Sequence, residues 1–341
     1  MTKISKIYLY ILVAVVCLWQ LPWLFNFLTA TPEERPFILY SSAIKDFAIR
    51  KNESGKTVYV DLNGNTYSKH QYDLLLPEYF ARQLAADKSL PDTLFGQPVD
   101  LKLLTDENLT LRIKPETVFG PYIPLFQMFE SQSGNVDLEM PPDVFRLDDT
   151  KMEFINKADN TLNAEKSADF TNELKKVGFE FPVVDVAGNV SEKKKYDNGY
   201  LFTDSEGCLF NVKMEQGRPV VRKIELPNGV VPTHCFVTEF IGRHSLGVFF
   251  DAAGQFYVIT QPYNKIVKTE LPPVDLGKGD FFVMGNMFTW TVRVTDEEKI
   301  TWYAIDANNF SLLKKYDIPL SDSHLGGLSF LKNGWVRVNW K

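Results

Sequence analysis

The longest apolar run in the chain lies at its N-terminus. Residues 7–28 carry no charge, and their strongly polar members are Gln20 and Asn26. A helix of this length covers about 33 Å at 1.5 Å per residue, which is enough to cross a hydrocarbon core of about 30 Å. The pattern therefore predicts an N-terminal transmembrane anchor over residues 1–30.

The charges that flank this run predict its orientation. Lys3 and Lys6 precede it, whereas Glu33, Glu34 and a single Arg35 follow it. The positive-inside rule then predicts a single pass through the inner (cytoplasmic) membrane, with the N-terminus in the cytoplasm and the main domain in the periplasm. A cleaved signal peptide is the alternative, although its apolar region usually has about 7–15 residues and ends at a small-x-small site.

One short unit recurs along the exported chain: an apolar run, Asp-x-x-Gly, and a second apolar run. Three copies align without gaps over residues 58–67, 201–210 and 248–257, with the pairs Asp61 and Gly64, Asp204 and Gly207, and Asp251 and Gly254. A variant at 303–310 has Asp306, with Asn309 at the glycine position. The aspartate accepts backbone N–H groups and the glycine takes positive φ, so each copy predicts a tight hairpin turn.

The spacing of these hairpins favours a mainly β, propeller-like fold. Asp204, Asp251 and Asp306 follow one another at intervals of 47 and 55 residues, somewhat above the ~40–45 residues of a typical propeller blade. We predict propeller-like repeats over residues 180–341, closed with strands from 40–68. A β-sandwich that reuses one favourable turn is the alternative.

Two helices interrupt the strand pattern. Pro77 suits the first turn of a helix that continues to Ala86, and Asn163 is a suitable cap for a helix over 164–177 that stops at Gly178. Both lie in a mixed β/α region that we assign to residues 31–179.

Composition excludes some function classes. The 341 residues have a net charge of -6 and a pI near 5.4, whereas nucleic-acid binders have a basic footprint. Three cysteines are too few for a disulfide scaffold. Cys208 and Cys235 are expected as free thiols in strands, with a disulfide as the alternative in an oxidising compartment.

The sequence contains no HExxH, GxSxG, P-loop or GxGxxG motif. The densest polar stretch is 130–146, whose weak catalytic candidates are Glu130, Asp137, Glu139, Asp143 and Arg146. A carboxylate pair from this stretch with an arginine clamp would suit glycan hydrolysis. The favoured interpretation is a half-buried strand, with Val136, Leu138 and Met140 facing inward. We predict no metal site and no cofactor, since His234 and His244 have no evident third ligand.

Several segments together resemble a known family. They are Leu21-Pro22-Trp23, the helix from Leu76-Pro77-Glu78-Tyr79 to Gln83-Leu84, Glu130-Ser131-Gln132-Ser133-Gly134, Asp143-Val144-Phe145-Arg146 and Lys195-Tyr196-Asp197-Asn198-Gly199-Tyr200. With them the chain is similar to an uncharacterised family of membrane-anchored proteins of the Bacteroides group that carries a domain-of-unknown-function label. The resemblance implies a cell-envelope location and an association with ABC-type transporter components, and it supplies no catalytic residues.

Two functions of different classes follow from the sequence. The first is a non-enzymatic, membrane-tethered extracytoplasmic binding or accessory protein, with the membrane and a protein such as a transporter subunit as partners. The alternative is an envelope glycan hydrolase that uses the carboxylates of residues 130–146. We take the first as the prediction.

Overall fold

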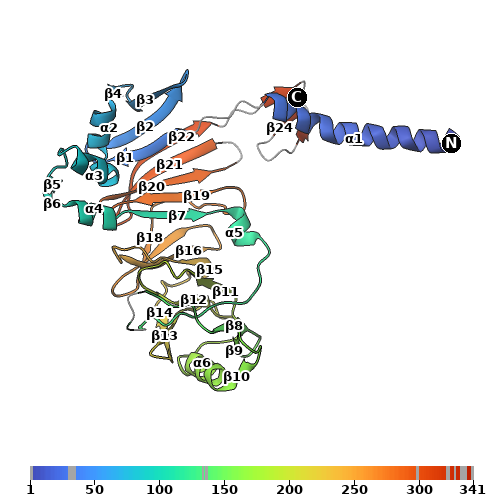
Figure 1. Ribbon diagram of the computed structural model, residues 1–341, viewed down its shortest axis with the longest axis vertical. Coiled ribbons are helices and arrows are strands. Elements are labelled where there is room, and N and C mark those ends of the chain that lie inside the picture. Colours follow the sequence, from blue (N-terminus) through green and yellow to red (C-terminus); the bar gives the residue numbers. More distant parts are fainter. Residues whose placement is uncertain are drawn as a thin grey trace.

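The computed structural model describes residues 3–29, 36–132, 134, 137–296 and 299–319, together with the strands 323–325, 328–330 and 336–338. Residues 1, 2 and 30 of the predicted anchor lie outside this set. Helix α1 (Lys3–Thr29) projects from the body of the molecule (Figure 1). Its Lys3–Leu21 portion is long and apolar enough to cross a membrane, and none of it is buried.

The body is built from small antiparallel sheets whose strands are mostly consecutive in the chain. We number five of them by position. Sheet I contains β1 (Phe37–Ser41), β2 (Asp46–Glu53), β3 (Lys56–Asp61) and β4 (Thr66–Tyr67). Sheet II contains β7 (Leu109–Ile113), β19 (Phe281–Gly285), β20 (Thr289–Thr295), β21 (Lys299–Asp306) and β22 (Leu312–Pro319), in the order β22-β21-β20-β19-β7.

The other three numbered sheets come from the middle of the chain. Sheet III contains β15 (Pro232–Val237), β16 (Ser245–Asp251), β17 (Phe256–Thr260) and β18 (Lys265–Lys268). Sheet IV contains β11 (Asp185–Gly188), β12 (Tyr200–Thr203), β13 (Leu209–Glu215) and β14 (Arg218–Ile224). Sheet V contains β8 (Asp143–Leu147), β9 (Met152–Asn156) and β10 (Leu162–Asn163).

Two small sheets complete the strands of the described chain. One is the hairpin of β5 (Thr93–Leu94) and β6 (Gln97–Pro98), and the other joins β23 (Ser323–Leu325), β24 (Leu328–Phe330) and β25 (Val336–Val338).

Sheets I to V follow one another along the long axis of the molecule (Figure 1). Apolar side chains join each sheet to the next: Phe47 and Trp302 between I and II, Phe256 and Phe281 between II and III, Leu209 and Phe249 between III and IV, and Phe145 and Phe202 between IV and V. The fold is mainly β and propeller-like, as the sequence predicts. Its blade-like sheets form an open array with I and V at opposite ends, and the strands from 40–68 build the separate sheet I, packed on II.

Helices cover the ends of this array. Helices α2 (Lys69–Leu75) and α3 (Pro77–Ala86) pack on sheet I, where Tyr72 and Leu76 meet Leu39 and Ala48. Helix α6 (Ala164–Lys176) packs on sheet V, and its cap Asn163 accepts a hydrogen bond from the Lys166 N–H. The two predicted helices are thus confirmed. Three further helices were not predicted: α2, α4 (Leu101–Asp106) and α5 (Pro115–Phe119).

The recurring turns have one geometry. Oδ1 of Asp61, Asp204 and Asp251 each accepts the N–H groups two and four residues ahead, at distances of 2.7–3.1 Å. The glycine three residues after each aspartate has a φ of 76–84°. The turn at Asp306 is one residue longer, and its residue with positive φ is Phe310, rather than Asn309. The ring of Phe310 is buried, so core packing holds this less favourable backbone.

Cys208 and Cys235 are both free thiols. Cys208 is half-buried and directly precedes β13, so the expected strand position is wrong for it. Cys235 is buried in β15, where its Sγ lies 3.7 Å from Oγ1 of Thr203.

Candidate binding cleft between two sheets

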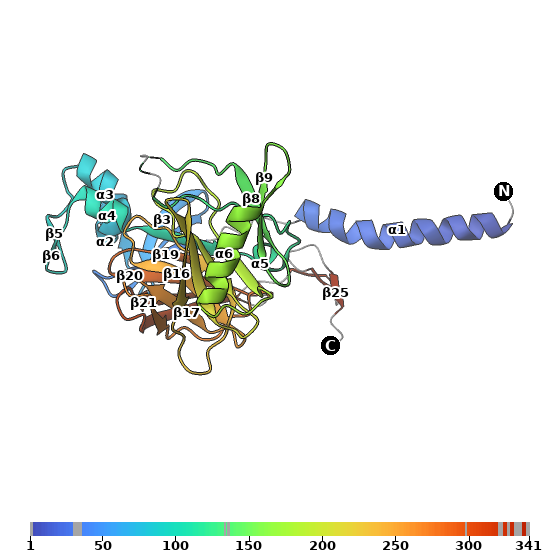
Figure 2. The ribbon, with the colours of Figure 1, turned by 90° about the horizontal axis from the view of Figure 1, so that it is seen from below.

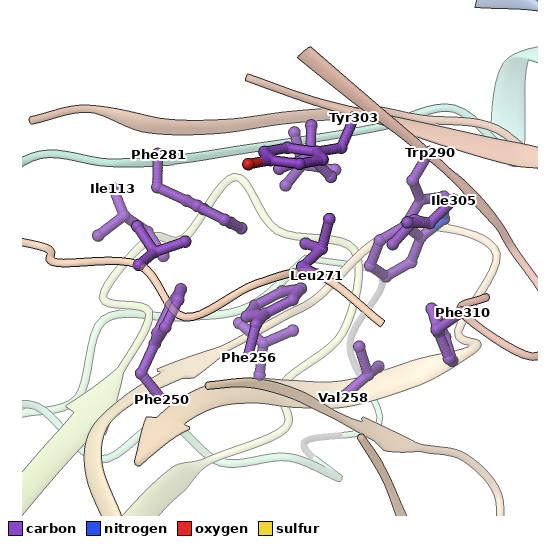
Figure 3. Close-up of a cluster of buried hydrophobic side chains, with 14 of the residues drawn as sticks. Ile113, Phe250, Phe256, Val258, Leu271, Phe281, Trp290, Tyr303, Ile305 and Phe310 are labelled. Atoms are coloured by element: carbon purple, nitrogen blue, oxygen red, sulfur yellow. The ribbon is translucent and has the colours of Figure 1, made fainter. Parts of the chain in front are cut away.

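A large apolar cluster fills the space between sheets II and III. Figure 3 shows Trp290, Phe310 and Val258 at one end of this cluster, and Phe250 at the other. Because side chains alternate between the two faces of a strand, the inward-facing side chains of both sheets point toward each other. They form a packed apolar cluster between the sheets.

A cleft of about 450 Å³ opens at the Trp290 end of this cluster. Val258, Trp290 and Phe310 contribute apolar atoms to it, and the loops that join the strands contribute polar ones. An apolar floor with a few convergent polar groups is the usual composition of a small-molecule site. This cleft is therefore the candidate functional site.

An imidazole and a carboxylate from distant parts of the chain contact each other at the cleft. Nε2 of His244, in the loop between β15 and β16, lies 2.7 Å from Oε2 of Glu107, which follows α4. The imidazole is 74% exposed, whereas the carboxylate is 14% exposed. Gly242 makes this approach feasible, since a Cβ there would lie 2.6 Å from Oε2 of Glu107. The glycine thus lets the loop close over the acidic side chain.

The neighbouring Arg243 is held in place by an aromatic ring. Its guanidinium carbon lies 4.2 Å from the ring centroid of Tyr196, and its own φ is 55°. The Tyr196 hydroxyl donates to the Phe240 carbonyl at 2.7 Å. Burial raises the pKa of Tyr196 to about 12, with a smaller contribution from Glu239. The tyrosine therefore remains a neutral donor at physiological pH and secures the loop that presents Arg243.

Below this loop lies a buried cluster of charged side chains. Nζ of Lys194 is 2.5 Å from Asp197 and 2.9 Å from Glu239, and the three side chains are 4%, 2% and 1% exposed. Glu239 also accepts the Asn198 N–H at 2.7 Å and the Asn189 side-chain amide at 2.7 Å. Burial raises the pKa of Glu239, while Asn198 and Lys194 oppose that rise. The cluster anchors the start of the loop that carries Arg243 and His244.

Two of the segments that carried the sequence resemblance meet at this cluster. The Ser131 hydroxyl donates to the Asp197 carboxylate, so residues 130–134 contact residues 195–200. The neighbouring Glu130 accepts the N–H groups of Gln216 and Gly217 at 2.7 and 2.8 Å, which fixes the β13–β14 hairpin. These segments therefore build the support of the loop at the cleft.

A family model, described as domain of unknown function DUF4857, matches residues 37–305. The chain belongs to this family. The match begins at β1 and ends within β21, so it includes most of sheets I to V and the whole of the buried charged cluster.

No curated protein matches this DUF4857 chain. Several solved structures resemble it at low similarity. The surface component PorZ of the type-IX secretion system of Porphyromonas gingivalis is 14% identical with a TM-score of 0.27, over 87% of this chain and 29% of PorZ. The WD40 domain of SCAP from fission yeast is 12% identical with a TM-score of 0.34, over 89% of this chain and 80% of that one. AztD from Citrobacter koseri is 9% identical with a TM-score of 0.30, over 87% and 65%.

The DUF4857 domain separates the carboxylates of residues 130–146. Asp143 is buried and pairs with Lys166 at 2.7 Å, whereas Glu130 fixes a hairpin of sheet IV. Arg146 pairs with Glu153 at 2.7 Å. Asp137 and Glu139 are exposed. Because Glu130, Asp143 and Arg146 each have different structural partners, the arrangement does not favour the hydrolase alternative.

The prediction of a half-buried strand in this stretch is wrong for the residues that the structure describes. Residues 137–142 form no strand, and Met140 is 48% exposed; Val136 lies outside the described residues. Two prolines, Pro141 and Pro142, interrupt backbone pairing there. His234 packs against Phe119 at the opposite end of sheet III, far along the strands from His244. In the described part of the chain, no three His, Cys, Asp or Glu side chains gather to hold a metal ion.

No motif marks Glu107 or Arg243 in the sequence, and His244 stands out there only as a histidine without a third metal ligand. The available signal was the Lys195–Tyr200 segment, which contributed to the resemblance and contains the tyrosine that holds Arg243.

Proposed function

We propose that this protein is a membrane-tethered extracytoplasmic binding or accessory protein whose ligand site is the cleft between sheets II and III. The observation that carries the proposal is the cleft itself: about 450 Å³ with an aromatic floor and a rim of fixed polar groups. Such a volume fits a small molecule.

Charge favours a small anionic ligand. Arg243 and Lys265 give the cleft two positive charges against the one carboxylate of Glu107, which contacts the imidazole of His244. Arginine recognises carboxylates and phosphates through paired hydrogen bonds. The stacking of Arg243 on Tyr196 fixes the guanidinium before a ligand arrives, which lowers the entropic cost of binding.

Helix α1 supports the tether. It contains an apolar span with none of its residues buried, and lysines lie at its N-terminal end. Such a helix is long and apolar enough to cross a bilayer, and the positive-inside rule then favours the sheets on the periplasmic side. Protease added outside intact spheroplasts should therefore digest the region after α1; full protection of that region would reverse the proposed topology.

The ligand site is tested with the full-length protein in detergent and a panel of small carboxylic acids, phosphate esters and neutral sugars. We expect carboxylates or phosphate esters to raise the melting temperature, and Arg243→Ala to abolish that rise. Arg218→Ala, which removes an exposed arginine of the β13–β14 hairpin, is the matched control. Equal responses of both variants, or stabilisation by neutral sugars alone, would contradict the anionic site.

A second part of the proposal concerns a protein partner in the same membrane, such as a subunit of an ABC-type transporter. A tethered domain with a ligand cleft suits the delivery of a ligand to a transporter at the membrane surface. Affinity purification from gently solubilised membranes should recover a membrane protein in a fixed ratio. Repeated recovery of this protein alone would count against the partner.

A further inference from the structure

We propose that the segment 119–125, Phe-Gly-Pro-Tyr-Ile-Pro-Leu, docks on the lipid surface of the membrane in which α1 is anchored. This inference rests on the proposed tether and adds a second, peripheral contact of the β domain with the bilayer. We call these residues the apolar segment.

The composition and exposure of the apolar segment are unusual for a protein surface facing water. The chain has no charged residue between Glu116 and Glu130. Within this stretch, Tyr122 is 74% exposed and Ile123 is 76% exposed, with Phe119 and Leu125 also exposed. Single exposed apolar residues are ordinary, but a contiguous group of large ones marks an interaction surface.

The apolar segment lies at the same end of the sheets as the start of β1. Phe37 and Phe282 line one small hollow. Phe282 pairs with Arg112 of β7, and α5 begins at Pro115, shortly after that strand. Figures 1 and 2 both show α5, and the chain leaving it, on the side of the body from which α1 projects.

The length of the connection keeps this side close to the bilayer. Helix α1 ends at Thr29 and β1 begins at Phe37, so a fully extended chain between them covers at most about 28 Å at ~3.5 Å per residue. The end of the sheets that carries Phe37 therefore remains within reach of the membrane surface. The cleft opens at the opposite end of the strands. Ser245, the first residue of β16, lines the cleft, as does Asn286, which follows the last residue of β19, whereas Asp251 and Phe281 lie at the other ends of these strands.

The chemistry of the apolar segment suits the interface between headgroups and acyl chains. A tyrosine places its ring among apolar atoms and its hydroxyl in water, which is why tyrosines concentrate in this zone. Pro121 and Pro124 restrict the backbone, so little conformational entropy is lost on insertion. Phe119 packs edge-on against His234, with ring centroids 5.2 Å apart, which ties the segment to sheet III.

The test uses the full chain with Cys17→Ser and Cys208→Ser, reconstituted in vesicles of phosphatidylethanolamine and phosphatidylglycerol that contain nitroxide-labelled lipid. A fluorophore is attached through Tyr122→Cys, or through Tyr263→Cys as the matched control. Tyr263 is 90% exposed in the β17–β18 turn, at the cleft end. Since interfacial residues lie about 5–10 Å below the surface, we expect lipid quenching to be about threefold stronger at position 122 than at 263.

A second variant distinguishes docking from mere proximity. Ile123→Asp should reduce the quenching at position 122 to the level at 263, whereas Val184→Asp, at an exposed apolar position of another surface, should leave it unchanged. Equal quenching at 122 and 263 in the parent protein would overturn the proposal. The proposal would also be overturned if a photocrosslinker attached at position 122 captured a protein in native membranes while the fluorophore at 122 was not quenched in pure lipid vesicles.

Failure of the tether gives a different result. If α1 does not hold the protein in the bilayer, the full chain will not float with the vesicles on a density gradient, whatever the label position. Flotation without quenching at position 122 leaves the tether intact and overturns lipid docking alone.

Discussion

The two ends of sheets II and III differ in the side chains that they expose. At the cleft end, the loop from β15 to β16 carries Arg243 and His244, and its first residues rest on the buried Lys194 cluster. At the other end, the apolar segment exposes Phe119, Tyr122 and Ile123 next to the Asp251–Gly254 turn. One core of aromatic side chains joins the two ends (Figure 3).

The contrast shows what each kind of surface requires. Charged side chains that must stay in place need buried partners, because an exposed ion pair contributes only about 0–1 kcal/mol and does not fix a geometry. An apolar surface needs no such support, but it must be covered by something other than water. This contrast fits the two proposals, ligand recognition at the cleft end and lipid contact at the other end.

The largest expected effect comes from removing the buried cation of the cleft end. Lys194→Met leaves Asp197 and Glu239 buried side by side without the ammonium group that pairs with both of them. Breaking a buried ion pair in this way costs about 3–5 kcal/mol. Chemical denaturation of the full chain in detergent should therefore show a lower free energy of unfolding by this amount, and the thermal response to anionic ligands should weaken because the Arg243 loop loses its support.

Lys278→Met is the control for this change, because its ion pair with Asp275 has side chains that are 65% and 58% exposed. It should cost no more than about 1 kcal/mol. Adding Asp197→Asn and Glu239→Gln to Lys194→Met should recover stability, since the uncompensated charges are then gone. A Lys194→Met variant as stable as the control would show that the cluster is not structural.

The next effect concerns a buried carboxyl group in α3, that of Glu78, whose backbone carbonyl accepts the Asn108 side-chain amide at 2.8 Å. Glu78 of α3 is 2% exposed, and burial raises the pKa of its carboxyl group from 4.5 to about 7. The folded state therefore holds this proton more tightly than the unfolded state. Stability from this group is fully present below about pH 4.5 and is lost as the pH rises to about 7, by about 3 kcal/mol in total.

Glu78→Gln should remove this pH dependence, because glutamine keeps the shape of the protonated acid without its ionisation. We expect the variant to match the parent near pH 4.5 and to exceed its free energy of unfolding by about 3 kcal/mol at pH 8. The exposed Glu116→Gln of α5 controls for the amide substitution itself. A difference between parent and Glu78→Gln that does not change with pH would contradict the assignment.

The sequence predicts the local parts of this fold better than their assembly. An Asp-x-x-Gly turn is encoded within five residues, so Asp204 and Gly207 were visible as a hairpin turn. The α6 helix was visible from its cap and period. The open order of the sheets was not visible, because β7 joins strands that lie about 170 residues later, and no local pattern records that pairing.

The cleft was hidden for the same reason. Glu107 and His244 are separated by 137 positions in the chain, and only the packing of α4 against the β15–β16 loop brings them to 2.7 Å. Polar density along the sequence pointed instead to residues 130–146, where the charged side chains serve hairpins and sheet V. Asn309 likewise stood at the glycine position of the repeat, but packing of the Phe310 ring shifted the positive φ by one residue.

The smallest expected effects come from two glycines that occupy the same position in two separate Asp-x-x-Gly turns. Gly64 lies in sheet I, and Gly254 lies in sheet III at the end that carries the apolar segment. Gly64 has a φ of 84°, and a Cβ added there would meet only open space, so Gly64→Ala should cost about 1 kcal/mol through backbone strain alone. Gly254 has a φ of 80°, but its Cβ would meet the Val274 carbonyl.

That contact should make Gly254→Ala the more costly change of the pair. The Val274 N–H donates to the Gly254 carbonyl at 2.8 Å, so the added methyl group must push away a strand connection that is hydrogen-bonded to the turn. Crowding and a weakened hydrogen bond add about 1–2 kcal/mol to the strain. Thermal unfolding of both variants measures the difference directly. Equal losses would mean that the connection at residues 273–276 yields freely, and that the apolar end is held only by the aromatic core beneath it.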